Sequence, residues 1–192
     1  MNDNDPVSTF RTRSSAVINI QDLRFSKLLS EDAIAEKVRS LAARINADYP
    51  DRSPIFLPVL NGAFMFASDL IKEITIPCKV SFVKLSSYNG AQSTGQLKTL
   101  IGQNESLFNQ DIIIVEDIVD SGLTLEKVMG ELTGLGARSV EAAALLRKKP
   151  AREKGTNVRY VGFELDDEFV LGYGLDYNGL GRNLKDLYKK VD

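Results

Sequence analysis

The stretch IIIVEDIVDSGLTL, residues 112–125, decides the fold of this chain. It opens with a run of aliphatic residues, which is typical of a strand covered on both faces in a parallel sheet. Three carboxylates, Glu116, Asp117 and Asp120, follow within five residues, and a small polar loop comes next. In open α/β sheets, ligands bind where the strands reach their carboxyl ends. We therefore expect residues 111–117 to form a central strand that ends at a binding site.

The rest of the chain alternates between strand and helix patterns. Ser30 is a suitable N-cap for a helix over residues 30–47, whose apolar residues share one face. Further helices are expected at 63–74 and from near Thr124 to Gly134, and further strands at 54–60, 78–85, 139–146 and 159–165. This alternation predicts an α/β fold with a doubly wound, mostly parallel sheet. We expect a single domain over residues 1–192, with 1–15 as a flexible leader.

The composition argues against several classes of protein. With a net charge of −2 and a pI of about 5.4, the chain shows no basic footprint for nucleic acid. Cys78 is the only cysteine, which rules out an intramolecular disulfide and fits a reducing compartment. There is no histidine, so acid–base chemistry is left to carboxylates, lysine or tyrosine. No apolar run reaches membrane-spanning length, and we expect a cytoplasmic protein that binds neither nucleic acid nor membrane.

The loop over residues 120–124 is suited to binding a phosphate. Its backbone N–H groups and the N-terminus of the next helix can surround an anion, and Gly122 allows close backbone approach. The neighbouring carboxylates can accept hydrogen bonds from sugar hydroxyls or hold Mg²⁺ through water, so the combination indicates a phosphorylated sugar. The alternative for any single residue is a plain turn with an N-cap and solvated acids. Neither a Walker loop nor a G-x-G-x-x-G after a strand is present.

The segment VEDIVDSGLT resembles the phosphoribosyl-pyrophosphate (PRPP) signature of type I phosphoribosyltransferases. The segments LPVLNGAFMFASDL, VKLSSYNGAQSTG, LLRKKP and YVGFELDDEFVLGYGLDYNGLGRNL occur in the order found in hypoxanthine (hypoxanthine-guanine) phosphoribosyltransferases. The resemblance covers roughly residues 20–188. It implies a parallel-sheet core and a small hood subdomain, built from both terminal parts of the chain, over the active site.

The resemblance also implies a purine-salvage reaction. In it, N9 of hypoxanthine, and also of guanine, displaces pyrophosphate from C1′ of PRPP and gives IMP or GMP. Asp120 would be the catalytic general acid/base near purine N7, a task for a carboxylate in a chain without histidine. The residues implied to bind the 5′-phosphate are Asp120, Ser121, Gly122, Leu123 and Thr124.

A metal site and a pyrophosphate loop follow from the same resemblance. Glu116 and Asp117 would face the ribose hydroxyls and a Mg²⁺ ion, and Asp176 matches the second acid of the metal site. Asn61 and Gly62 match the pyrophosphate loop, whose leading peptide is often cis in the family. Many members carry a basic residue where this chain has Asn61, and we expect a weaker attraction for pyrophosphate here.

The base would be read by residues near the end of the chain. Lys148 would donate to the 6-oxo group, which selects hypoxanthine and guanine over adenine, whereas the alternative is a solvated lysine. Phe169 matches the aromatic residue that stacks on the purine, and Val170 matches the backbone that reads the base edge. Asp176 belongs to this purine site as well, and Arg182 matches a pyrophosphate contact.

The polar segment over residues 86–96 matches the mobile loop that closes over the reaction in the family. Ser87 and Tyr88 would reach the pyrophosphate from it. Such a lid shields a reactive sugar cation from water. The alternative is a plain connecting segment.

Two alternatives to hypoxanthine transfer remain at this point. One is the same PRPP chemistry with xanthine as the preferred base, which the segment EFVLGYGLDYN does not exclude. The other is a PRPP-binding regulator without turnover. The expected partners are small-molecule substrates, PRPP and a 6-oxopurine, together with further copies of the chain in a dimer or tetramer.

Overall fold

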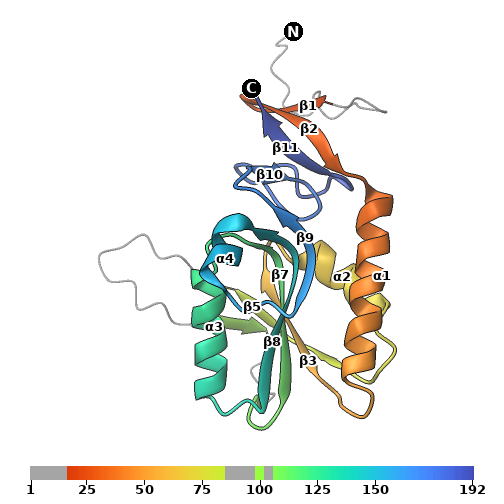
Figure 1. Cartoon of the computed structure of the whole chain (residues 1–192), viewed down its shortest axis with the longest axis vertical. Helices are drawn as coiled ribbons and strands as arrows, with labels where there is room; N and C mark the ends of the chain where they lie inside the picture. The colour runs from red at the N-terminus through yellow and green to blue at the C-terminus, as the bar shows by residue number, and fades with distance from the viewer. Residues whose placement is uncertain (1–16, 85–97, 102–105) are drawn as a thin grey trace, which may run out of the picture.

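The computed structural model describes residues 17–84, 98–101 and 106–192 (Figure 1). Its strands form two sheets, a large and mostly parallel one and a small antiparallel one above it. Helices cover both faces of the large sheet. This arrangement confirms the predicted α/β class and the predicted hood.

The large sheet has the strand order β6–β5–β3–β7–β8–β9, and β4 pairs with β3 at one end. The pairs are parallel except for β5 with β6. The bounds of the strands are β3 (Ile55–Leu60), β4 (Lys79–Val80), β5 (Phe82–Lys84), β6 (Lys98–Ile101), β7 (Asp111–Val119), β8 (Ser139–Lys148) and β9 (Tyr160–Leu165). Because β3, β7, β8 and β9 run in one direction, their carboxyl ends lie along the same edge.

The expected strand over 78–85 is two short strands, β4 and β5, interrupted at Ser81. Both pair with β3, where the carbonyl of Phe56 accepts a hydrogen bond from the N–H of Ser81 at 3.0 Å. Two residues further along β3, Pro58 presents the same edge without an N–H. The ladder therefore cannot continue through this position.

Helices α1 and α2 pack on one face of the large sheet, and α3 and α4 on the other (Figure 1). Their bounds are α1 (Glu31–Asp48), α2 (Phe64–Lys72), α3 (Leu123–Gly134) and α4 (Lys149–Lys154). The start of α1 is as predicted, because the Oγ atom of Ser30 accepts a hydrogen bond from the N–H of Ala33 at 3.2 Å. Its apolar stripe is buried, as expected for a helix packed on a sheet.

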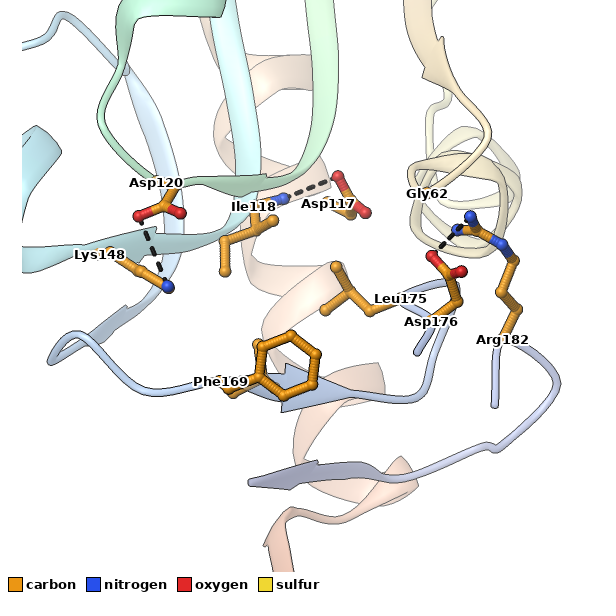
Figure 2. Close-up of a pocket in the computed structure, with 10 residues that line it drawn as sticks. Gly62, Asp117, Ile118, Asp120, Lys148, Phe169, Leu175, Asp176 and Arg182 are labelled. Carbon is orange, nitrogen blue, oxygen red and sulfur yellow. Dashed lines mark hydrogen bonds and ion pairs between the residues drawn. The ribbon is translucent and has the colours of Figure 1, made fainter. Parts of the chain in front are cut away.

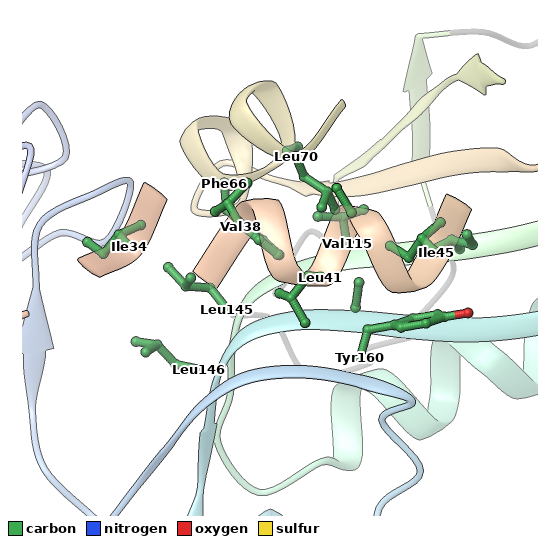
Figure 3. Packing of buried hydrophobic residues seen from close by; sticks show 14 of the residues in the cluster. Ile34, Val38, Leu41, Ile45, Phe66, Leu70, Val115, Leu145, Leu146 and Tyr160 are labelled. Carbon is green, nitrogen blue, oxygen red and sulfur yellow. The ribbon is translucent and has the colours of Figure 1, made fainter. Parts of the chain in front are cut away.

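The central strand β7 is covered on both faces, as its aliphatic run predicts. Ile113 and Val115 pack into the cluster formed with α1 and α2 (Figure 3). Ile112 and Ile114 pack into the opposite cluster, under α3. Burying an aliphatic side chain of this size stabilises a fold by about 1.5–3 kcal/mol. The strand is therefore a rigid support for the residues that follow it.

The hood is a four-stranded antiparallel sheet in the order β1–β2–β11–β10. Its strands are β1 (Val17–Ile20), β2 (Leu23–Leu29), β10 (Val170–Leu171) and β11 (Leu187–Val191), so both terminal parts of the chain contribute. Phe25, Leu171 and Tyr188 pack at its centre. Asp186, which directly precedes β11, joins the hood to α1: it pairs with Lys27 of β2 at 2.5 Å and accepts a hydrogen bond from the N–H of Glu31, the first residue of α1, at 2.8 Å. Among the described residues, no helix is long and apolar enough to span a membrane.

Candidate active site

A cavity of about 340 Å³ lies between the carboxyl edge of the large sheet and the hood (Figure 2). A second cavity, of about 200 Å³, lies next to it against the start of α3. Ile118 and Asp120, at the end of β7, line both cavities. The end of β7 and the residue after it therefore form the wall between two adjoining cavities, which we treat as one site.

Most of the predicted site residues come together at these cavities. Those that line the larger cavity are Gly62, Asp117, Asp120, Lys148, Phe169, Val170, Asp176 and Arg182. Those that line the smaller one are Glu116, Asp120, Ser121, Gly122 and Thr124. Leu123 and Asn61 line neither cavity, and Ser87 and Tyr88 lie outside the described residues.

The two adjacent acids of β7 face different cavities, because consecutive strand residues point to opposite faces. Glu116 and Asp117 are each at least nine-tenths buried. Burial, and then the charge of Asp117, raises the pKa of Glu116 well above its ordinary value. Burial likewise raises the pKa of Asp117 to about 6, against the opposing effect of the Ile118 N–H, which donates to its Oδ1 at 2.9 Å. Two buried carboxylates without a cation paired to them within the described residues are suited to hydroxyl donors or a metal ion.

The loop after β7 has the form of an anion site. Gly122 has φ +80° and is the N-cap of α3, and residues at the start of this twelve-residue helix line the smaller cavity, where backbone N–H groups of a helix N-terminus can bind an anion. A Cβ on Gly122 would lie 2.0 Å from the Oγ1 atom of Thr156. Thr156 is buried and donates to Glu126 of α3 at 3.0 Å. This position therefore requires glycine for two reasons, its backbone conformation and its close packing.

The opposite end of the larger cavity has the character of a site for a planar base. The ring of Phe169 lies opposite the side chain of Ile118, with Leu175 beside them (Figure 2). Phe169 is partly exposed, and it is held by ring contacts with Phe25 and Tyr177 at 6.1 and 5.9 Å between centroids. An apolar slot of this kind fits an aromatic ligand between the two side chains.

Lys148 reaches this slot from the end of β8. Its stem is buried, and its Nζ atom lies 3.0 Å from a carboxylate oxygen of Asp167 and 3.5 Å from one of Asp120. The alternative of a solvated lysine does not describe this position. The ammonium group is held at the edge of the cavity, where it can donate to a polar atom of a ligand.

Asp176 and Arg182, expected at the metal and at the pyrophosphate, form an ion pair with each other at 2.6 Å. Arg182 also donates to the carbonyl of Gly174, and Asp176 accepts from the N–H of Gly179, each at 2.6 Å. Both side chains line the larger cavity on the side of Asp117 (Figure 2). The pair places one positive and one negative group beside the buried acid.

The Leu60–Asn61 peptide is cis, as the resemblance led us to expect. Gly62 lies against Asp117, and a Cβ at this glycine would be 1.7 Å from the Oδ2 atom of the acid. The side chain of Asn61 is exposed. Gly62 therefore allows the loop after β3 to approach the buried carboxylate directly.

Several residues of the site were not predicted from the sequence, among them apolar lining residues of both cavities. Ile118 and Leu175 line the base slot, and Asp167 holds Lys148. The position of Ile118 between the acids and the loop was the only sequence feature that pointed to a role in the site. An isoleucine at that position is otherwise expected to be an ordinary core residue. Asp167 lies two residues before Phe169 and looks like any exposed loop acid. Within the described residues, no group of three acidic, histidine or cysteine side chains is close enough to form a metal site by itself.

Comparison with known proteins agrees with this geometry. The family model described as "Phosphoribosyl transferase domain" matches residues 25–178. The hypoxanthine-guanine phosphoribosyltransferase of Staphylococcus epidermidis is 40% identical over 158 residues, which cover 82% of this chain and 88% of the relative. The bifunctional protein TilS/HprT of Listeria innocua is 41% identical over 158 residues, but the match spans only 24% of that longer protein.

A solved structure shows the same fold. The crystal structure of a hypoxanthine-guanine phosphoribosyltransferase from Bacillus anthracis superposes with a TM-score of 0.78 at 34% identity, covering 91% of this chain and all of that one. The family model matches well over half of the chain, and its range, residues 25–178, includes the large sheet and the loop after β7. The chain therefore belongs to the phosphoribosyltransferase family.

Proposed function

We propose that this protein is a purine-salvage enzyme that transfers the 5-phosphoribosyl group of PRPP to N9 of hypoxanthine, and also of guanine. The observation that carries the proposal is the adjacency of the two cavities at the end of β7, one suited to a phosphate and the other to a planar base. The ribose would lie between them, beside Ile118 and Asp120, which line both. The names and identities of the relatives support the same activity.

PRPP would bind with its 5′-phosphate in the loop from Asp120 to Thr124. Glu116 and Asp117 would accept hydrogen bonds from the ribose hydroxyls on the two sides of the strand. Arg182 and the Asn61–Gly62 loop would meet the pyrophosphate. Ser87 and Tyr88 are proposed to reach the same group from the lid segment.

The acids of this site fit a Mg²⁺ ion, because carboxylate oxygens are the ligands that this ion prefers. Asp117 is the best placed of them, since it is buried and lines the same cavity as Asp176. Glu116 would act from the neighbouring cavity. When bound, the ion would offset the charge of the pyrophosphate as it leaves. Water and PRPP oxygens would complete its coordination.

The base would lie between Phe169 and Ile118, with its 6-oxo group toward Lys148 and its edge along the backbone of Val170. Lys148 is a donor only, so it favours a carbonyl at C6 over the amino group of adenine. As the C1′–O bond to pyrophosphate breaks, N9 forms its bond to C1′. Asp120 would take or return the proton at N7, and closing the site would keep water from the sugar cation.

We propose further that residues 1–192 act as one domain, that the enzyme works in the cytoplasm, and that it assembles as a dimer or tetramer. The first point is supported by the strands from both terminal parts that form the hood over the core. The second is supported by the single cysteine, Cys78, which is unpaired.

A spectrophotometric assay with PRPP and Mg²⁺ tests the activity, with hypoxanthine, guanine, xanthine and adenine offered in parallel. We expect turnover of hypoxanthine and guanine and none of adenine. Turnover of xanthine above both would reassign the preferred base. PRPP binding without turnover of any base would point instead to a regulator.

Asn61→Lys is expected to lower KM for PRPP and Kd for pyrophosphate by about three- to tenfold, because it adds one positive charge near the pyrophosphate at a partly screened position. The Asn61 side chain is exposed, so the lysine can be accommodated. Steady-state kinetics and calorimetric titration with pyrophosphate measure the change, with Asn61→Gln as the uncharged control. Unaltered affinities in Asn61→Lys would show that only the loop backbone contacts the pyrophosphate.

A further inference from the structure

We propose that Asp167 is a positioning residue that holds the ammonium of Lys148 at the edge of the base slot and keeps its contact with Asp120 the longer of the two. This inference rests on the function proposed above, in which Lys148 reads the 6-oxo group and Asp120 handles the proton at N7. It starts from a feature of the sheet. Three adjacent strands, β7, β8 and β9, each lead at their carboxyl ends to one of these three charged residues.

The distances show which partner holds the lysine. The Nζ atom of Lys148 lies 3.0 Å from an oxygen of Asp167, with hydrogen-bond geometry, and 3.5 Å from one of Asp120. Within the described part of the chain, these are the two carboxylates paired with this ammonium. The contact with Asp167 is therefore the shorter of the two and draws the charge toward the loop before β10.

The surroundings make Lys148 dependent on this contact. Its side chain is only 11% exposed, so the buried stem limits the directions in which the ammonium can point. Asp167 and Asp120 are 71% and 63% exposed, and each can move to meet it. Without Asp167, Coulombic attraction would draw the ammonium closer to Asp120, the other carboxylate already paired with it. That contact would occupy both the donor for the 6-oxo group and the carboxylate needed at N7.

Asp167 also connects the lysine to the stacking residue. Phe169 follows it by two residues in the same loop, so the ion pair ties the end of β8 to the segment that carries the ring. The ion pair therefore links the 6-oxo donor to the segment that carries the stacking ring. We infer that this carboxylate contributes to base affinity without touching the base.

The test compares the steady-state kinetics of Asp167→Asn with those of the wild-type enzyme. We expect KM for hypoxanthine to rise about five- to tenfold, a modest figure because the pair is partly exposed, with KM for PRPP unchanged. Asp166→Asn is the matched control, as an exposed neighbouring acid without an ion pair among the described residues, and should behave as wild type. Asp167→Glu, which keeps the charge, should restore most of the affinity for hypoxanthine.

A double-mutant cycle separates positioning from a general effect on the fold. Lys148→Met should lose most of the affinity for hypoxanthine, and adding Asp167→Asn to it should change nothing more. Additive losses, or a rise in KM for PRPP equal to that for hypoxanthine, would overturn the inference. The thermal unfolding midpoint of Asp167→Asn should match that of wild type, because the substituted side chain is exposed and similar in size.

The same assay distinguishes the failure of this inference from failure of the proposed function. If the wild-type protein turns over hypoxanthine and Asp167→Asn is indistinguishable from it, only the role of Asp167 falls. If the wild-type protein turns over no 6-oxopurine, the proposed function is contradicted, and so is the role of Asp167 that rests on it.

Discussion

Asp120→Asn is expected to lower kcat for hypoxanthine by about 10²- to 10⁴-fold, the usual contribution of a positioned general acid or base. Asp120 lines both cavities, and the chain has no histidine that could replace it. The loop should keep its shape, because the main-chain carbonyl of Asp120, which accepts from the N–H of Ala151 at 3.1 Å, is unaffected by the substitution. Lys148 would retain its partner Asp167.

The measurement is kcat and KM for both substrates, together with calorimetric binding of PRPP. PRPP should bind the variant nearly as well as the wild type, since an asparagine preserves the backbone N–H groups of the loop. Ser121→Ala serves as a contrast, because losing a hydroxyl donor to phosphate should raise KM for PRPP and leave kcat nearly unchanged. A kcat for Asp120→Asn within a factor of a few of wild type would show that the N7 proton passes to another group.

Asp117→Asn is expected to stabilise the free protein at pH 8 by about 3 kcal/mol while sharply reducing its activity. Burial raises the pKa of Asp117 to about 6, roughly two units above its ordinary value, and each unit corresponds to about 1.4 kcal/mol. A carboxyl group whose pKa is raised by folding holds its proton more tightly in the native state. It therefore costs little below about pH 4, destabilises the fold increasingly as the pH rises from about 4 to 6, and carries its full, constant penalty above that.

Urea denaturation of wild type and Asp117→Asn at pH 4 and pH 8 measures this effect. The neutral amide keeps an acceptor for the N–H of Ile118, so the gain at pH 8 should shrink to well below 1 kcal/mol at pH 4. Glu116 adds to the stabilisation of the variant at pH 8. The charge of Asp117 is one of the two causes that raise the pKa of Glu116, and the substitution removes it. Equal stability of the two proteins at pH 8 would show that the carboxylate is not penalised by its surroundings. Saturating PRPP and Mg²⁺ should stabilise the wild type more than the variant.

The core of the fold could be predicted from local patterns. The run in β7, the capped helix α1 and the alternation of strands and helices are signals carried by neighbouring residues, and the structure confirms each of them. The break between β4 and β5 was missed. It depends on Pro58 in the neighbouring strand, and a cross-strand hydrogen bond cannot be read from a single segment. The C-terminal strand β11 was missed for a similar reason, since it is completed only by pairing with β2 and β10.

The same distinction between local patterns and long-range contacts holds for the site. The sequence alone determined which residues could do the chemistry, because the acids, the small polar loop and the downstream segments form recognisable local motifs. Only the tertiary structure decided which cavity each of these residues faces and which of them contact one another. It turns Glu116 and Asp117 toward different cavities, sets Ile118 opposite Phe169, pairs Asp176 with Arg182 and joins Lys148 to Asp167. The physical reason is that burial and contacts between distant segments set most of these relations: Phe169 meets Ile118, and Asp167 meets Lys148, only once β7, β8 and β9 lie side by side beneath the hood.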